Sequence, residues 1–356
     1  MNQKKMTKST LSILLLVATL HTQAQQSRIW TKEQAKVWQE KQGFRVGANF
    51  LPSSAINQLE MWQKESWDPQ TIDKELGWAE AIGMNVMRVY LHDIAWEVDP
   101  EGFLDRMDQF LGIADDHHIK ILFTIFDDCW NPDAKAGLQP APKPGIHNSG
   151  WVRSPNKILH DNASGYTKLE RYVKAVLTRF KDDTRIYLWD LYNEPGNSGY
   201  GISSMTLLEQ VFQWAWAVRP SQPLSVGVWF QQYPDLNKFQ LRNSDVITFH
   251  NYDDTASLKK AIDSLKSFGR PMVCTEYMAR TRGSRFETHL PIFKRYGVTA
   301  INWGLVAGKS NTIYQWDTPL PDGSEPKTWF HDVFRKNGTP YSTMEAEAIR
   351  RATGRN

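Results

Sequence analysis

Short runs of β-branched and aromatic residues recur along the chain, and segments with helical spacing of apolar residues lie between them. Eight such runs are predicted as strands, over residues 44–49, 85–91, 120–126, 186–192, 223–228, 245–251, 271–275 and 298–303. Because eight strand–helix units close a parallel barrel, the pattern predicts an α/β fold, a single-domain (β/α)8 or TIM barrel. A doubly wound open sheet is the alternative, but no glycine-rich phosphate loop follows an early strand.

Helix boundary signals lie between the predicted strands. Asp68 and Pro69 predict a helix start, and Gly83 ends an apolar face formed by residues 72, 76, 79 and 82. The same spacing predicts helices over residues 169–180 and 258–269. Residues 31–34 resemble a capping box, which predicts a further helix that closes the bottom of the barrel.

The first 24 residues have the pattern of a secretory signal. Lys4, Lys5 and Lys8 precede an apolar run over residues 11–20, and small residues follow at the positions that a signal peptidase reads, up to Ala24. The run is too short to span a bilayer, which argues against the alternative of an uncleaved anchor. We therefore expect an exported protein, periplasmic or extracellular, with one mature domain over residues 25–356 that is not held at the membrane.

Composition and charge exclude several classes of protein. The chain has 356 residues, of which 41% are hydrophobic, so disorder, a coiled coil and a small disulfide scaffold are excluded. The formal charge of +3 equals the three lysines of the signal segment, and the balanced remainder predicts no nucleic-acid partner. The sequence has no ligand-spaced His/Cys group and no nucleotide loop, so we expect neither metal nor cofactor, and a monomer.

Two glutamates lie where predicted strands end. Glu194 follows the fourth strand and Glu276 follows the seventh, so in a barrel both belong to the rim that carries active sites. Two carboxylates facing each other across a pocket can cleave a glycosidic bond, one as acid and one as nucleophile or base. Taken singly, either glutamate is explained as well by an ordinary ion pair at the rim.

The neighbours of the two glutamates favour a catalytic site. Arg88 lies within an apolar strand and must find an anion, for which a rim carboxylate is the nearest candidate. His250 and Tyr252 fall on one side at the end of the sixth strand, because side chains alternate every two residues. Trp303, at the end of the eighth strand, offers a flat apolar face for a sugar ring.

These residues resemble clan A of the glycoside hydrolases, most closely the cellulase-like family five. The resemblance covers nearly the whole mature chain and rests on Asn193-Glu194-Pro195, Thr275-Glu276-Tyr277, His250-Asn251-Tyr252, Arg88 and Trp303. It implies a retaining β-glycosidase with Glu194 as general acid/base and Glu276 as nucleophile. The resemblance further implies that Asn193 binds the sugar 2-hydroxyl. The other implied roles are that Arg88 and Tyr252 hold Glu276, that His250 orients the catalytic pair or the sugar, and that Trp303 floors the cleaved subsite.

The sequence departs from the family pattern after the third strand. Many members carry histidines there, whereas this chain has Asp127-Asp128-Cys129-Trp130. We expect one of the two aspartates, Asp127 or Asp128, to face the pocket. This aspartate either binds sugar hydroxyls or caps the loop. The segment over residues 127–165 is long enough to indicate a binding loop. Several aromatic residues lie on this face and predict a carbohydrate groove: Trp130, Trp151, Trp229, Phe230 and Trp316. The alternative is that half of them only pack the loops against the barrel.

The two cysteines are predicted to remain free thiols. Cys274 shares parity with Glu276 and is expected to point into the barrel, while Cys129 follows the third strand, nearly opposite the seventh.

The expected partner is a carbohydrate substrate. The leading prediction is hydrolysis of a β-linked polysaccharide or oligosaccharide, with a β-1,4-glycan such as xylan, mannan or glucan as the default. An exo-acting β-glycosidase or a transglycosylase would use the same carboxylates. A non-catalytic carbohydrate-binding barrel is a further alternative, but binding alone does not require a paired acid and nucleophile.

Overall fold

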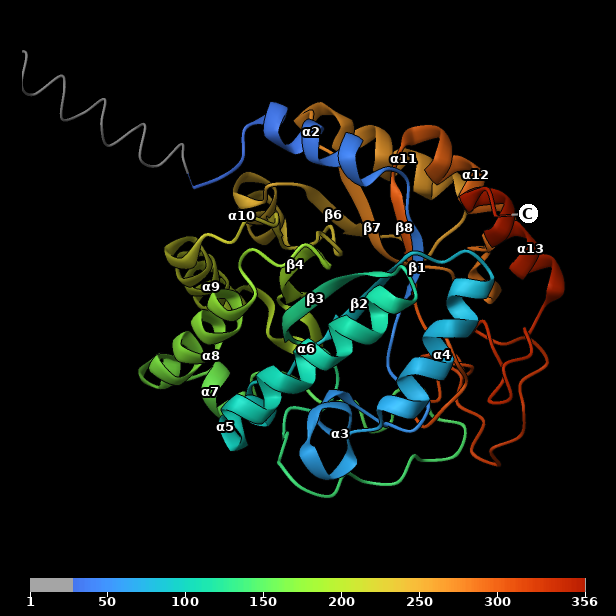
Figure 1. The fold of residues 1–356 in the computed structure, drawn as a ribbon, viewed down its shortest axis with the longest axis horizontal. Helices are drawn as coiled ribbons and strands as arrows, with labels where there is room; N and C mark the ends of the chain where they lie inside the picture. Colours follow the sequence, from blue (N-terminus) through green and yellow to red (C-terminus); the bar gives the residue numbers. More distant parts are fainter. Residues whose placement is uncertain (1–27, 356) are drawn as a thin grey trace, which may run out of the picture.

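A parallel eight-stranded sheet forms the centre of the computed structural model, which describes residues 28–355 (Figure 1). The predicted export signal, residues 1–24, lies outside the described residues. The strands are β1 (Val46–Asn49), β2 (Val86–Tyr90), β3 (Lys120–Asp127), β4 (Ile186–Asn193), β5 (Leu224–Ser225), β6 (Ile247–His250), β7 (Met272–Tyr277) and β8 (Thr299–Asn302).

The strand order is that of a barrel. Neighbours pair in the order β5-β4-β3-β2-β1-β8-β7-β6, so the first strand and the last strand of the chain lie side by side. The gap between β5 and β6 is spanned by a single parallel bridge from Val228 to Phe249. The eight strands therefore form a nearly closed (β/α)8 barrel, as predicted from the sequence.

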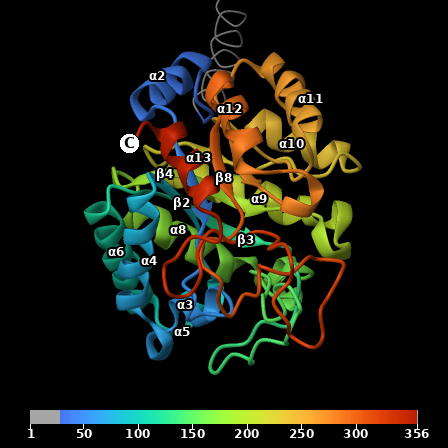
Figure 2. The same cartoon turned by 90° about the vertical axis from the view of Figure 1, so that its right-hand side faces the viewer.

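Helices surround the strands (Figures 1 and 2). They are α2 (Lys32–Gln42), α3 (Gln58–Trp62), α4 (Pro69–Ala81), α5 (Asp93–Val98), α6 (Pro100–Asp116), α7 (Lys157–His160), α8 (Tyr166–Arg179), α9 (Met205–Val218), α10 (Pro234–Asn243), α11 (Thr255–Leu265), α12 (Phe286–Tyr296) and α13 (Thr343–Thr353). The predicted cap of α4 is present, since the Asp68 side chain accepts a hydrogen bond from the Thr71 N–H. Within the described part of the chain, no helix has both the length and the apolar character to cross a membrane.

The barrel interior is closed at one end by α2. Apolar side chains from β2, β3, β4, β7 and β8 form one buried cluster with Ala35 of α2. The capping box that Thr31 and Gln34 were predicted to form is present at the start of this helix. The N-terminal end of the barrel is therefore filled, and the opposite end remains for the site.

The predicted orientation of Cys274 is wrong. Val273 belongs to the interior cluster, whereas Cys274 packs in the larger cluster between strands and helices. The pairing of β7 with β8 shifts register between Cys274 and Tyr277, so the alternation on which the prediction relied is interrupted before Glu276. Both cysteines are free thiols in the structure.

Two long segments cover the open end of the barrel, opposite α2 (Figure 1). One follows β3 and contains the short helix α7, and the other connects β8 to α13. Hydrogen bonds join them: the Asn148 N–H donates to Ser310 O at 2.9 Å, and the Leu320 N–H donates to Gly145 O at 3.0 Å. The two segments together form one wall of the cavity described next.

Candidate active site

A cavity of about 1180 Å³ lies at the carboxyl ends of the strands. It brings together most of the residues that the sequence singled out, namely Asp127, Trp130, Trp151, Asn193, Glu194, Trp229, His250, Tyr252, Glu276 and Trp303. Arg88 and Asp128 do not line it.

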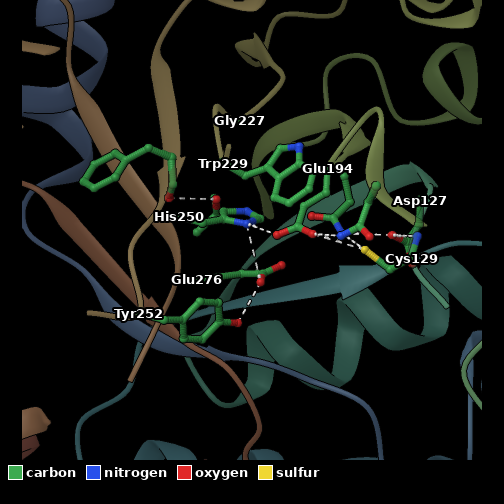
Figure 3. Close-up of polar contacts among 12 residues, drawn as sticks. Asp127, Cys129, Glu194, Gly227, Trp229, His250, Tyr252 and Glu276 are labelled. Carbon is green, nitrogen blue, oxygen red and sulfur yellow. Dashed lines mark hydrogen bonds and ion pairs between the residues drawn. The ribbon is translucent and has the colours of Figure 1, made fainter. Parts of the chain in front are cut away.

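The two glutamates reach this cavity from separate strands. Glu276 lies in β7, and Glu194 directly follows β4 with a φ of 45°, a left-handed conformation that is uncommon for a residue other than glycine. The Asn197 N–H donates to the Glu194 carbonyl at 2.9 Å, which fixes the turn. One carboxylate oxygen of each glutamate and one ring nitrogen of His250 lie within 4.8 Å of one another. Figure 3 shows these three side chains pointing toward a common space.

The carboxylate of Glu276 accepts hydrogen bonds on both oxygens. Arg88 Nη1 and Tyr90 Oη lie 2.7 and 2.9 Å from Oε1, and Tyr252 Oη lies 2.7 Å from Oε2. Burial favours the neutral acid, but the charges of His250 and Arg88 and these hydrogen bonds together lower the pKa of Glu276 below its ordinary value. Glu276 is therefore held ionised, as a nucleophile requires.

Arg88 acts from beneath the cavity, fully buried in β2. Its guanidinium also donates to Asp190 Oδ2 at 2.5 Å and to Asn193 Oδ1 at 2.7 Å. The anion that the sequence argument required is thus supplied twice, by Glu276 and Asp190. Sequence reasoning missed Tyr90 and Asp190, although the strand period places Tyr90 on the same side as Arg88.

Glu194 has different donors. His250 Nδ1 lies 2.7 Å from Oε1, Cys129 Sγ lies 3.3 Å from Oε2, and the Asn197 amide also contacts Oε2. Burial favours a neutral imidazole, but the Glu276 charge and the bond to Glu194 raise the pKa of His250 above its ordinary value. The two carboxylates therefore have unequal surroundings, with a guanidinium and two phenols on one, and an imidazole, a thiol and an amide on the other.

Glu194, His250 and Glu276 form the one group of three metal-type ligands found among residues 28–355. The three residues come from three separate strand ends, so their spacing in the sequence does not have the pattern of a metal site. His250 Nδ1 lies 2.7 Å from Glu194 and 3.5 Å from Glu276, so an imidazole with a raised pKa supplies positive charge between the carboxylates. The arrangement fits proton sharing within the cluster.

The two aspartates at the end of β3, Asp127 and Asp128, have different surroundings. Asp127 lines the cavity, but its oxygens accept hydrogen bonds from Asn193 Nδ2 at 2.9 Å and Trp151 Nε1 at 2.6 Å. Asp128 faces away and accepts from the Gly196 N–H at 2.8 Å, which holds the loop after β4. Burial raises the pKa of Asp127 to about 6 and that of Asp128 to about 7. Asp127 thus orients Asn193, while Asp128 caps the loop.

The aromatic residues fall into two groups. Trp151 and Trp303 are buried against each other, with ring centroids 5.6 Å apart, and Trp151 packs edge-on against Tyr90. Trp130 is 37% exposed at the cavity, and Trp229 stacks on Phe230 with ring centroids 5.1 Å apart. Some of these rings therefore pack the loops and others present surface to the cavity, and the carbohydrate groove stays a prediction.

Comparison with known proteins places this barrel among carbohydrate-active enzymes. A model of the cellulase family, glycosyl hydrolase family 5, matches residues 47–309. No match was found among curated proteins.

Solved structures share the fold at low identity. Endo-1,4-beta-mannanase from Rhizomucor miehei is 14% identical with a TM-score of 0.58, over 88% of this chain and 94% of that one. Exo-beta-1,4-mannosidase from Opitutaceae bacterium strain TAV5 is 17% identical with a TM-score of 0.60, over 88% of this chain and 60% of that one. GH5_18 from Streptomyces cattleya, in complex with GlcNAc, is 12% identical with a TM-score of 0.60, over 88% of this chain and 80% of that one.

The family match spans well over half of the chain and includes both glutamates, the arginine beneath them and the histidine between them. The chain therefore belongs to the cellulase family, glycosyl hydrolase family 5, and is a glycoside hydrolase.

Proposed function

We propose that the protein is an exported β-glycoside hydrolase that acts with retention of anomeric configuration, with β-1,4-mannosides as its first substrate class. The observation that carries the mechanism is the approach of Glu194 and Glu276: one carboxylate oxygen of the first lies within 4.8 Å of one carboxylate oxygen of the second. Retaining glycosidases have carboxyl groups about 5–5.5 Å apart, whereas inverting enzymes need about 6.5–9.5 Å to admit a water molecule.

In the first step Glu276 attacks the anomeric carbon. Its charge is maintained by Arg88, Tyr90 and Tyr252, and its Oε2 atom has a single strong donor, the Tyr252 hydroxyl at 2.7 Å. The Glu194–His250 pair holds one proton across a 2.7 Å contact, and Glu194 passes this proton to the departing glycosidic oxygen.

In the second step the covalent glycosyl-enzyme is hydrolysed. Ester formation removes the negative charge of Glu276, which had favoured the protonated form of His250. Glu194, now without its proton, accepts one from water, and the resulting hydroxide attacks the anomeric carbon and releases Glu276. The pair thereby regains the proton that the next cycle needs.

The substrate class is supported by the names of the similar structures, which include an endo-β-1,4-mannanase and an exo-β-1,4-mannosidase. The cavity adds open aromatic surface at Trp130 and Trp229, on which neutral sugar rings can stack. Activity on β-1,4-mannan should be compared with activity on glucan and xylan, the competing β-1,4-glycans.

Proton NMR of the first-formed product tests the mechanism. We expect the β-anomer to appear first from a β-mannoside and to mutarotate afterwards, whereas an α-anomer as the first product would exclude the retaining mechanism. Incubation with a 2-deoxy-2-fluoro mannoside, followed by peptide mass spectrometry, should find the label on Glu276. Labelling of another residue would remove Glu276 as nucleophile.

Export is the part of the proposal that rests on residues 1–24 alone. Expression of the full chain in a bacterial host should yield a mature protein outside the cytoplasm with an N-terminus near Gln25. Full-length protein retained in the cytoplasm would contradict this part of the proposal and leave the chemistry unaffected.

A further inference from the structure

The cavity extends mainly to one side of the glutamate pair. Many of the residues that line it follow β5 and β6, and they reach from Phe230 after β5 to Asn237 of α10 and Lys260 of α11. Within residues 28–355, no residue of the segments that follow β1 and β2 lines the cavity. The free space therefore lies on the β5–β6 side of the barrel mouth.

Three aromatic side chains fill the opposite side. Tyr90 of β2, Trp151 after β3 and Trp303 after β8 form one buried cluster, with ring centroids between 5.1 and 5.8 Å apart. A second cavity lies between these rings and Leu51, in the segment after β1, and its volume is about 20 Å³. This space has room for one water molecule and not for a sugar ring.

The segment after β1 is joined to the two segments that wall the cavity. The buried Gln58 Nε2 donates to the carbonyl oxygen of Val152 at 2.7 Å, and the Lys309 N–H donates to that of Ser53 at 3.2 Å. Lys309 Nζ also forms an ion pair with Glu60 at 2.6 Å. The segments after β1, β3 and β8 therefore form one continuous wall, which closes the β1–β2 side of the barrel mouth.

The surroundings of the two glutamates give the direction of a bound chain. Glu276 accepts two hydrogen bonds from side chains of β2, whereas the donors to Glu194 follow β3 and β4 or belong to β6. Trp229 Nε1 donates to the carbonyl oxygen of Pro195 at 3.2 Å, which places this ring beside the Glu194 turn (Figure 3). The line from Glu276 to Glu194 therefore runs from the closed side of the cavity toward the open side.

The roles of the two glutamates orient the sugar along this line. Glu276 bonds the anomeric carbon, and Glu194 protonates the oxygen that leaves with the aglycone. The aglycone therefore extends toward β5 and β6, where the cavity is open, and the glycone lies toward the wall. A glycone unit that meets the wall has no space for a further sugar on its non-reducing side.

We propose that the enzyme is exo-acting: it binds the non-reducing end of a β-mannan chain against the wall and releases one mannose in each turnover. The proposal rests on the proposed function and names which bond of the chain is cut. Each turnover consumes one water molecule and leaves the chain one unit shorter, with a new non-reducing end. Phe230, which is 37% exposed at the open side, contacts the departing chain.

Mannohexaose with a fluorescent 2-aminobenzamide label on its reducing end tests the mode of attack. In early samples we expect unlabelled mannose and a labelled pentasaccharide. Unlabelled oligosaccharides of two or more units in the same samples would show internal cleavage and overturn the proposal. Early release of labelled mannose would place the cut at the reducing end, which also overturns it.

A matched pair of substrates tests the wall itself. A 4,6-O-benzylidene group on the terminal unit of labelled mannohexaose occupies the position where the wall lies. The capped hexaose should lose about a hundredfold in kcat/KM relative to the uncapped one, because the added group has no space. Similar rates on both substrates would contradict a closed non-reducing side.

The variant Phe230→Ala tests the direction of the chain. It should raise KM for mannohexaose several-fold, with mannose still the first product, because it removes a contact to the departing part of the substrate. An unchanged KM would contradict the placement of the aglycone toward β5. Val37→Ala is the control, because Val37 is an exposed apolar residue of α2, at the other end of the barrel, and its loss should leave KM unchanged.

Failure of the proposed function has a different result. Absence of cleavage of any β-mannoside would contradict mannan as the substrate. Labelled and capped cello-oligosaccharides, compared in the same way, then test whether the closed side of the cavity imposes exo action.

Discussion

The thiol of Cys129 lies 3.3 Å from Oε2 of Glu194 and is positioned to donate a hydrogen bond to it. Burial and the charges of Asp127 and Glu194 raise the pKa of Cys129 well above its ordinary value, so the sulfur keeps its proton. Asn193 Nδ2 approaches the same sulfur at 3.4 Å, which orients the thiol. Cys129 is thus a positioning residue for Glu194, the acid/base of the proposed mechanism.

The variant Cys129→Ala should lower kcat several-fold with little change in KM. Loss of the thiol removes one of the donors that orient the Glu194 carboxylate, which then depends on His250 and Asn197 alone. Steady-state kinetics measure the change, and Cys129→Ser, which retains a donor, should resemble the wild type more closely. An unchanged kcat in the alanine variant would exclude this role.

Much of this site could be predicted from the sequence because parallel strands end at one rim. Glu194, Glu276 and His250 each follow an apolar run, and the barrel topology alone brings them together. The role of Cys129 could not be found in this way. Its position depends on the path of an irregular loop, which is fixed by backbone contacts such as Asn148 N–H to Ser310 O, at 2.9 Å.

The error on Cys274 has a similar physical origin. Strand parity is reliable where the ladder is regular, as from Val86 to Tyr90 in β2. In β7 the register shifts between Cys274 and Tyr277, and a local irregularity of this kind leaves no clear mark in the sequence. Such irregularities are common beside active sites, where they redirect a side chain, and Glu276 lies within this one.

Tyr252→Phe should move the acid limb of the kcat/KM profile to higher pH. The Tyr252 hydroxyl donates to Glu276 Oε2 at 2.7 Å, and its loss removes one of the interactions that hold the pKa of Glu276 below its ordinary value. Activity, which is lost as pH falls through this pKa, should then disappear earlier on acidification, with about a tenfold lower kcat/KM at mildly acidic pH.

Tyr90→Phe is the informative comparison. Tyr90 donates to Glu276 Oε1 and also accepts from Arg88 Nη1 at 2.6 Å, so its loss removes an acceptor for a buried guanidinium. Both variants should shift the acid limb, and Tyr90→Phe should also lower the melting temperature. Unchanged acid limbs in both variants would show that the phenols do not control ionisation of the nucleophile.

Asp332→Asn should flatten the pH dependence of stability. Asp332 is fully buried, with both carboxylate oxygens 2.8 Å from Thr312 Oγ1, and burial raises its pKa to about 7 from 3.8. Between these pH values the folded state holds a proton that the unfolded state has released, so stability falls as pH rises toward 7. The asparagine variant lacks this contribution.

Thermal denaturation between pH 5 and 8 measures the effect. The loss of melting temperature across this range should be about 2–4 °C smaller in Asp332→Asn than in the wild type. Asp322→Asn is the control, because Asp322 is solvated and hydrogen bonding by Ser324 lowers its pKa. Equal slopes in the wild type and Asp332→Asn would contradict the prediction.

Variants of Trp130 and Trp151 should distinguish a ring that binds substrate from a ring that packs the loop. Trp130 is 37% exposed at the cavity, so Trp130→Ala should raise KM for mannotetraose several-fold, with little change in kcat or melting temperature.

Trp151 is 3% exposed and donates to Asp127 Oδ2 at 2.6 Å, and Asp127 in turn orients Asn193. Trp151→Phe should therefore lower both melting temperature and kcat, because it leaves a buried carboxylate short of a donor. Steady-state kinetics and thermal denaturation on both variants distinguish the two roles, and a Trp130 variant that loses stability but keeps KM would assign that ring to loop packing instead.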